Sequence, residues 1–208
     1  NYPDEVVFDQ LFLRFDDIAD SGFSLTLGRQ DLILGNGMII LEGTPFDQGR
    51  SLYQDGAVLR YKGEENTVTT FALYNHWKDR ITIMNDRDRR LRLGDTFTTG
   101  IYWTHNFDAA FNFDLYYIFN YVDDDSRIPM RGHAYYEDLS LHTIGMRLFG
   151  KVLDEQLEYS LELAKQAGYC TKEYDDSKKH YDNQGFMLDA RIRLHAPKDT
   201  LLSPSLGF

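Results

Sequence analysis

The sequence predicts an all-β protein, an antiparallel up-and-down transmembrane β-barrel of which about ten strands are present. One observation is an unbroken alternation of apolar and polar side chains over residues 110–121. A second is that short and long connections alternate between the expected strands. A third is the aromatic content of 14 tyrosines and 14 phenylalanines, in a chain without any apolar run near the ~20 residues of a spanning helix.

The clearest element is residues 110–121, AFNFDLYYIFNY. Phe111, Phe113 and Leu115 fall on one face, and Asn112 and Asp114 fall on the other. A period of two residues is typical of a β-strand with one apolar and one mostly polar face. Because a tilted strand crosses a bilayer in roughly 9–11 residues, this stretch is long enough to span one. A soluble β-sandwich also uses such strands, so the choice between the two depends on the rest of the chain.

The same alternation predicts the other strands in order. Residues 7–15 and 23–30 flank an acidic turn, 56–61 and 67–74 flank KGEEN, and 96–104 precedes 110–121. The last pairs are 139–149 with 156–168, and 185–194 with 201–208. The turns within pairs have about five to seven residues, whereas the connections 31–54, 75–95, 122–138 and 169–183 have about fifteen to twenty-four. Outer-membrane barrels have this asymmetry, with short periplasmic turns and longer extracellular loops.

A single domain is predicted, residues 1–208, as one barrel segment with its short turns periplasmic and its long loops extracellular. Both chain ends then fall at the long-loop end. Because a complete bacterial barrel has both termini at the periplasmic end, we expect this chain to be a middle segment of a larger barrel.

Composition argues against several other classes of protein. The net charge of −11 disfavours nucleic acid as a partner. The one cysteine, Cys170, excludes an internal disulfide and a cysteine-based zinc site, and it is expected to be exposed in a long loop. The six histidines are scattered, and no nucleophile-elbow or phosphate-loop motif occurs. We therefore predict no catalytic residue, no metal and no cofactor.

Arginines gather on the polar faces of the predicted strands, the side that lines a barrel lumen. Charged rings of this kind lower the barrier to ions of opposite charge, and the guanidinium fork suits carboxylates. The alternative is that these arginines pair with lumen acids and brace the wall; both interpretations stay open. The arginines are Arg14, Arg60, Arg147, Arg191 and Arg193, and the acids on the same faces are Asp114, Glu158, Glu162 and Asp189.

Four stretches carry a resemblance to a known family. They are SLTLGRQDLILGNG at 24–37, YQDGAVLRY at 53–61, LHTIGMRLFG at 141–150 and LEYSLELAKQAG at 157–168. Together they resemble the alginate-export family of bacterial outer-membrane barrels. The resemblance implies a barrel of roughly eighteen strands in the bacterial outer membrane, with an arginine-rich conduit.

The resemblance also implies a function. The protein would be a passive channel that passes an anionic polysaccharide or oligosaccharide, alginate-like, and it would catalyse nothing. Its partners would be the anionic saccharide, outer-membrane lipid and lipopolysaccharide, and periplasmic export machinery. Arg29 belongs to the matched motif and is included among the lumen candidates, although alternation places it with the outward Leu27. Either a bulge at Gly28 turns it inward or it sits at the rim.

Two other functions and one structural question stay open. The first alternative function is a porin for small anions or oligosaccharides, and the second is a soluble carbohydrate-binding β-sandwich. The connection 31–54 is unusually apolar for a loop. Either it folds into the lumen as a constriction, or the strands extend beyond the membrane and pack there; we favour the second.

Overall fold

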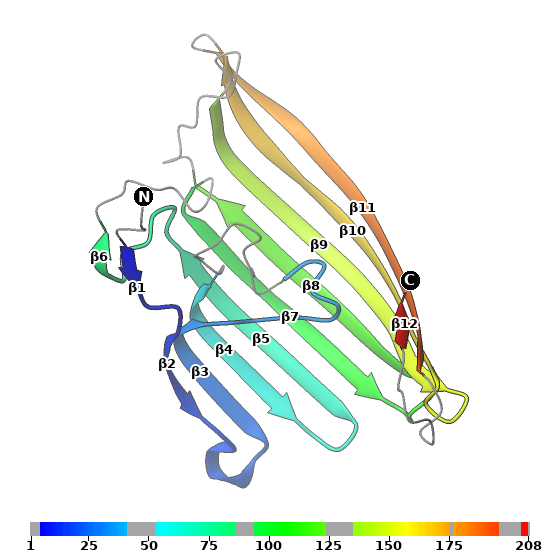
Figure 1. Cartoon of the computed structure of the whole chain (residues 1–208). Coiled ribbons are helices and arrows are strands. Elements are labelled where there is room, and N and C mark those ends of the chain that lie inside the picture. The colour runs from blue at the N-terminus through cyan, green and yellow to red at the C-terminus, as the bar shows by residue number, and fades with distance from the viewer. Residues whose placement is uncertain are drawn as a thin grey trace.

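The chain forms one large curved sheet. The computed structural model describes residues 5–40, 53–85, 94–123, 135–174, 177–195 and 205–207. Within them, ten antiparallel strands pair in the order β2-β3-β4-β5-β7-β8-β9-β10-β11-β12 (Figure 1). Their bounds are β2 Leu11–Phe15, β3 Phe23–Gln30, β4 Gln54–Lys62, β5 Asn66–Asn75, β7 Thr96–Asn106, β8 Asn112–Val122, β9 Tyr135–Val152, β10 Leu157–Tyr174, β11 Ser177–His195 and β12 Ser205–Gly207. The all-β, antiparallel meander predicted from the sequence is confirmed.

The first predicted strand, residues 7–15, is wrong in one respect, because it is split in two. Its first part is β1 (Glu5–Val7), which pairs with β6 (Thr82–Asn85) in a separate two-stranded sheet. Its second part is β2. The chain leaves the strand near Phe8, whose carbonyl oxygen accepts a hydrogen bond of 2.9 Å from Nη1 of Arg29. The strand β6 lies inside the predicted connection 75–95 and was not expected there.

The predicted long connection 169–183 is also wrong. The strand β10 continues to Tyr174 and β11 begins at Ser177, and their pairing runs from Leu157 opposite Leu194 to Tyr174 opposite Ser177. Cys170 is therefore buried within β10 rather than exposed in a loop. The strands β9, β10 and β11 rise well past their neighbours in Figure 1. The sequence over 169–183 is polar at most successive positions, so it carries no alternation that would reveal this extension.

One face of the sheet, called the outer face here, is apolar and open to solvent. It carries the apolar side chains that the sequence predicts for the lipid-facing side. The strand pairing places these side chains in the same rows on neighbouring strands. Phe186 is 72% exposed and Leu13 is 66% exposed. Other exposed members are Phe15, Leu59, Ile101, Leu115, Ile144, Met146, Leu188 and Ile192. None of the helical structure in the described residues is long and apolar enough to cross a membrane.

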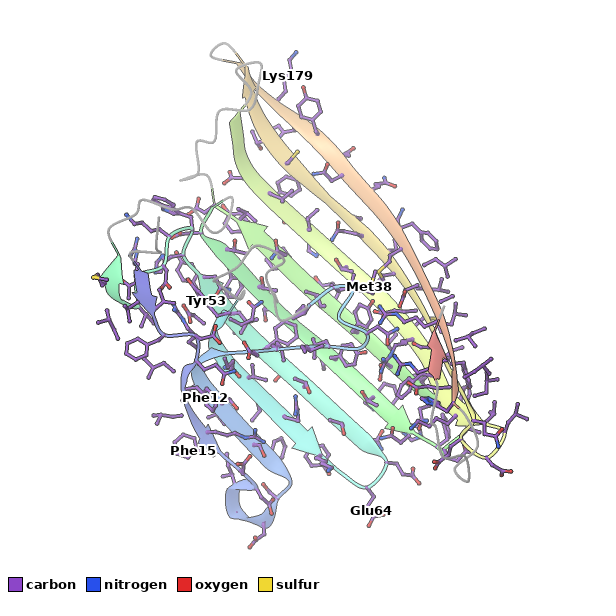
Figure 2. All side chains as sticks on the ribbon, in the orientation of Figure 1. Phe12, Phe15, Met38, Tyr53, Glu64 and Lys179 are labelled. Carbon is purple, nitrogen blue, oxygen red and sulfur yellow. The ribbon has the colours of Figure 1, made fainter. Side chains whose placement is uncertain are left out.

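The opposite face, called the inner face here, is covered in part by residues 31–40. This segment leaves the end of β3 and crosses in front of the sheet (Figure 1), and Figure 2 shows Met38 over its middle. Leu32, Leu34 and Ile40 pack with inner-face side chains that include Phe71 and Tyr116. For residues 31–40, the favoured expectation that this connection packs beyond the strands is therefore wrong. Residues 41–52 lie outside the described residues.

Candidate functional site

Asn36 fastens the inner segment, residues 31–40, to three strands at once. Its side-chain Nδ2 donates to Oγ of Ser160 on β10 (2.8 Å) and to Oδ2 of Asp189 on β11 (2.9 Å). Its Oδ1 accepts from Nη1 of Arg147 on β9 at 2.8 Å. Its backbone oxygen accepts from Nη2 of Arg191 at 3.4 Å. All polar groups of the Asn36 side chain are thereby used, as a half-buried amide requires.

A glycine makes this close approach possible. Gly35 has φ +60°, and a Cβ built on it would lie 2.7 Å from the hydroxyl of Tyr102. The turn around it is closed by hydrogen bonds from Gly37 N to Leu34 O (3.0 Å) and from Leu34 N to Ile40 O (3.1 Å). A side chain at position 35 would be strained by the left-handed backbone, and either the hydroxyl of Tyr102 or the turn itself would have to shift.

Arg147, which donates to Asn36, is neutralised by acidic side chains of the inner face. Its Nε lies 2.6 Å from Oδ2 of Asp114, which also accepts a hydrogen bond from Tyr102 at 2.5 Å. Tyr116 stacks on Tyr102 with ring centroids 5.2 Å apart, and it donates to Oε1 of Glu162 at 2.8 Å. Asp114 and Glu162 are buried, and each keeps one oxygen without a hydrogen-bond partner. For Arg147, the bracing interpretation describes the contacts.

Two further predicted arginines lie on β11 beside this cluster, and both meet acids. Arg191 Nε is 2.9 Å from Oδ2 of Asp189, and the side chains are 46% and 16% exposed. Arg193 approaches Glu158 only to 3.7 Å, with more than half of its side chain exposed. An exposed pair of this kind contributes about 0–1 kcal/mol, so Arg193 is held weakly and is available to other anions.

A second part of the inner face is open and basic. A cavity of about 430 Å³, called the basic groove here, lies over β2, β3 and β4. It is lined by the positively charged side chains of Arg14, Arg60 and Lys62. The aromatic ring of Phe12 and the amide of Gln30 also line it. Its volume suits a small ligand or a segment of a longer one.

Two acidic side chains reduce the positive charge of the basic groove. Arg14 pairs with Asp16 at 2.7 Å in an exposed position. Asp31 accepts a hydrogen bond from Gln10 and keeps its other oxygen buried without a partner. Arg60 donates only a long 3.4 Å hydrogen bond to Oγ1 of Thr69. The groove therefore retains a positive balance, in contrast to the acid-rich wall around Arg147.

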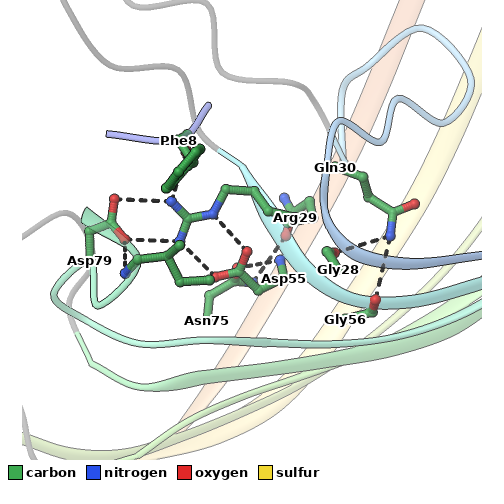
Figure 3. A network of polar contacts seen from close by, with 10 residues as sticks. Phe8, Gly28, Arg29, Gln30, Asp55, Gly56, Asn75 and Asp79 are labelled. Atoms are coloured by element: carbon green, nitrogen blue, oxygen red, sulfur yellow. Dashed lines mark hydrogen bonds and ion pairs between the residues drawn. The ribbon is translucent and has the colours of Figure 1, made fainter. Parts of the chain in front are cut away.

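Arg29 does not join the other arginines. The pairing of β3 with β2 and β4 has no register shift, so the bulge considered for Gly28 is absent and Arg29 stays on the outer face at the long-loop end. Its guanidinium is 1% exposed and bonds to both Asp55 and Asp79 at 2.9–3.1 Å (Figure 3). The ring of Tyr53 lies 3.5 Å from it. The assignment of Arg29 to the lumen is therefore corrected. Arg29 belongs to a structural cluster at the long-loop end of the sheet, which is called the rim here.

A second rim contact fixes the segment that follows β5. The carboxylate of Asp95 accepts hydrogen bonds from the hydroxyl of Tyr74 (3.0 Å) and from the backbone N–H of Trp77 (2.9 Å), and it lies 2.9 Å from Nδ1 of His76. Burial by itself would raise the pKa of Asp95, but these contacts stabilise the charged form and hold the pKa below its usual value.

Sequence reasoning found the inner-face arginines and missed the residues that organise them. Asn36, Gly35, Tyr102 and Tyr116 were not expected, although Glu162 was among the acids on the polar faces. The GlyAsnGly run at 35–37 was the available signal, because it marks a tight turn inside an apolar connection. No group of three or more histidine, cysteine or acidic side chains in the described part of the chain is arranged to hold a metal.

Comparisons with known proteins do not identify a relative. No family model, no curated protein and no solved structure matches the chain.

Proposed function

We propose that the chain is part of the wall of a bacterial outer-membrane channel, of the alginate-export type, that passes an anionic saccharide. The observation that carries this proposal is the outer face. Burying a large apolar side chain stabilises a protein by about 1.5–3 kcal/mol relative to leaving it in water. Many such side chains are exposed on this face. In the described residues the second sheet has only the strands β1 and β6, too few to cover this face as a β-sandwich would.

The height of the apolar band suits a bilayer. On β8 the outer-face residues run from Phe113 to Tyr121, about 26 Å along the strand or roughly 20 Å across a membrane at a tilt near 40°. Trp103 packs edge-on against Phe113 at one end, with centroids 5.0 Å apart. At the other end, the hydroxyl of Tyr121 bonds to Asp138 at 3.0 Å. Trp103 also donates from Nε1 to Oδ1 of Asn66 at 2.9 Å, so both borders carry an aromatic residue with a polar partner. Such residues are typical of barrel girdles.

The inner face supports an anion path that runs beside residues 31–40. Over β8 to β11, the inner face is occupied by the turn around Asn36. Acidic side chains of these strands neutralise the arginines there. The basic groove over β2 to β4 stays open, with Arg14, Arg60 and Lys62 on it. An anion passing there exchanges part of its hydration for contacts with these cations. Residues 31–40 act as the constriction that narrows the path.

The proposal is tested by ion selectivity in a planar bilayer. The full-length protein is expected to conduct anions in preference to cations, with a current that oligouronate blocks. Arg60→Glu reverses one charge on the groove and is expected to shift the reversal potential toward that of a cation. Lys179→Glu is the matched control, because this exposed lysine lies on β11, away from the basic groove and beyond the row of Tyr121 at which the apolar band ends. The reversal potential of this variant should equal that of the unmodified protein.

Each contrary result has a distinct meaning. If Arg60→Glu leaves the reversal potential unchanged, the anion path through the basic groove is wrong. An anion current that ignores oligouronate would favour the porin for small anions. The soluble carbohydrate-binding β-sandwich would be favoured if the protein stays monomeric in buffer without detergent.

A further inference from the structure

A second cavity lies at the long-loop border of the outer face. This rim cavity has a volume of about 470 Å³ and is bounded by Leu11 and Tyr74 of the sheet and by Lys78, Arg80 and Ile81 of the segment after β5. Leu11 pairs with Arg29, and Arg29 with Asp55, in the same outer-face row of the sheet. The cavity therefore opens on the side opposite to the inner face and shares nothing with the basic groove.

The floor of the rim cavity is closed to a charged ligand. Arg29 forms two hydrogen bonds with each of Asp55 and Asp79 and a fifth with the backbone oxygen of Phe8 (Figure 3). All five N–H groups of its guanidinium are therefore used. Two carboxylates against one guanidinium leave an excess negative charge at this depth. His76, which also lines the cavity, is engaged by Asp95 at 2.9 Å. Any anion must therefore be recognised at the mouth rather than at the floor.

The mouth of the rim cavity combines cations with apolar surface. Lys78 and Arg80 line it, and Arg80 is exposed. Beside them, Leu11 is 50% exposed and Ile81 is 36% exposed. Tyr74, 48% exposed, stands next to Phe97 in a pairing that continues to Tyr121, where the apolar band ends. Basic side chains next to apolar ones at this height match a lipid, with its headgroup at the border and its chains along the wall.

We propose that the rim cavity binds a phosphorylated lipid of the outer leaflet, with the phosphate at Lys78 and Arg80 and an acyl chain against Leu11 and Ile81. This rests on the proposed membrane channel, because only then does the outer face meet lipid. The guanidinium of Arg80 offers a fork of donors to phosphate oxygens, and Lys78 adds a point charge. The closed floor keeps the headgroup at the surface, where the acyl chains can remain in the bilayer.

Native mass spectrometry of the full-length protein in detergent tests this site. The probes are lipid A, which carries phosphates, and the same lipid A after enzymatic dephosphorylation. The unmodified protein is expected to retain the phosphorylated form at least tenfold more tightly. Arg80→Glu combined with Lys78→Glu should abolish that preference, and the double change to glutamine should weaken it. Lys179→Glu, which reverses an exposed charge on β11 away from the rim cavity and beyond the apolar band, should preserve it.

Several outcomes would overturn the site. They are equal retention of both lipid forms, an equal loss of preference in Lys179→Glu, and displacement of lipid A by inorganic phosphate alone. Bilayer current measured on the same variants separates this proposal from the channel, because the rim cavity lies outside the conducting path. A missing lipid preference with normal current contradicts only the site, whereas a retained preference without current contradicts only the channel.

Discussion

At the scale of single residues, side-chain partners decide what each charge can do. The alternation of the strands correctly placed Arg14, Arg60, Arg147, Arg191 and Arg193 on one face, because a period of two fixes the side of every residue. It could not reveal that Asp114 neutralises Arg147, since the two lie 33 positions apart and meet only through the register of β8 with β9. The difference between braced and available arginines is therefore a product of the fold.

Asp95 gives a pH-dependent prediction at this scale. Because its folded pKa lies below the unfolded value, its stabilisation is present above about pH 4 and is lost as the pH falls through the folded pKa. Asp95→Asn keeps the size but loses the charge, and it should lower the free energy of unfolding by about 1–2 kcal/mol at pH 7. Urea titrations in detergent at pH 7 and pH 3 measure this.

The gap between Asp95→Asn and the unmodified protein should shrink at pH 3. Asp154→Asn is a suitable control, because that carboxylate is exposed in the turn between β9 and β10 and makes no hydrogen bond or ion pair with the described residues. A gap that is the same at both pH values would mean that the carboxylate of Asp95 does not stabilise the rim.

At the scale of elements, residues 31–40 are the part of the chain that sequence pattern alone interpreted least well. The segment is apolar, and an apolar connection can pack equally well beyond the ends of the strands or against the inner face of the sheet. Its place was decided by contacts distant in the chain, since Asn36 is 111 residues from Arg147 and 153 from Asp189. The same limit explains the misjudged ends of β10 and β11, whose pairing holds together a stretch without alternation.

Asn36→Ala tests the role of this element. The change removes the hydrogen bonds of the side chain to Ser160, Asp189 and Arg147. We expect a loss of about 1–3 kcal/mol in stability. If the proposed channel is correct, we also expect a larger single-channel conductance, because residues 31–40 are then no longer held over the inner face. Asn106→Ala is a matched control at the exposed end of β7, where the same truncation should leave the conductance unchanged. An unaltered conductance in Asn36→Ala would show that residues 31–40 do not limit the current.

At the scale of the whole molecule, the two faces of one sheet have opposite character. The outer face carries exposed leucine, isoleucine and phenylalanine, and the inner face carries arginines, acids and residues 31–40. The sequence was sufficient to assign these faces and most strands, because one periodic signal governs both. It was insufficient for the rim cavity, which joins segments from four separate stretches of the chain.

The most direct test of this account asks which face meets lipid. Trp77→Phe and Trp103→Phe remove both tryptophans of the chain, and Leu59→Trp or Arg60→Trp then adds one at nearly equal height on opposite faces of β4. Brominated lipid in reconstituted vesicles is expected to quench the fluorescence of Leu59→Trp strongly and that of Arg60→Trp weakly, with the reverse order for aqueous iodide. Equal quenching of the two by brominated lipid, or none of Leu59→Trp, would contradict the membrane wall.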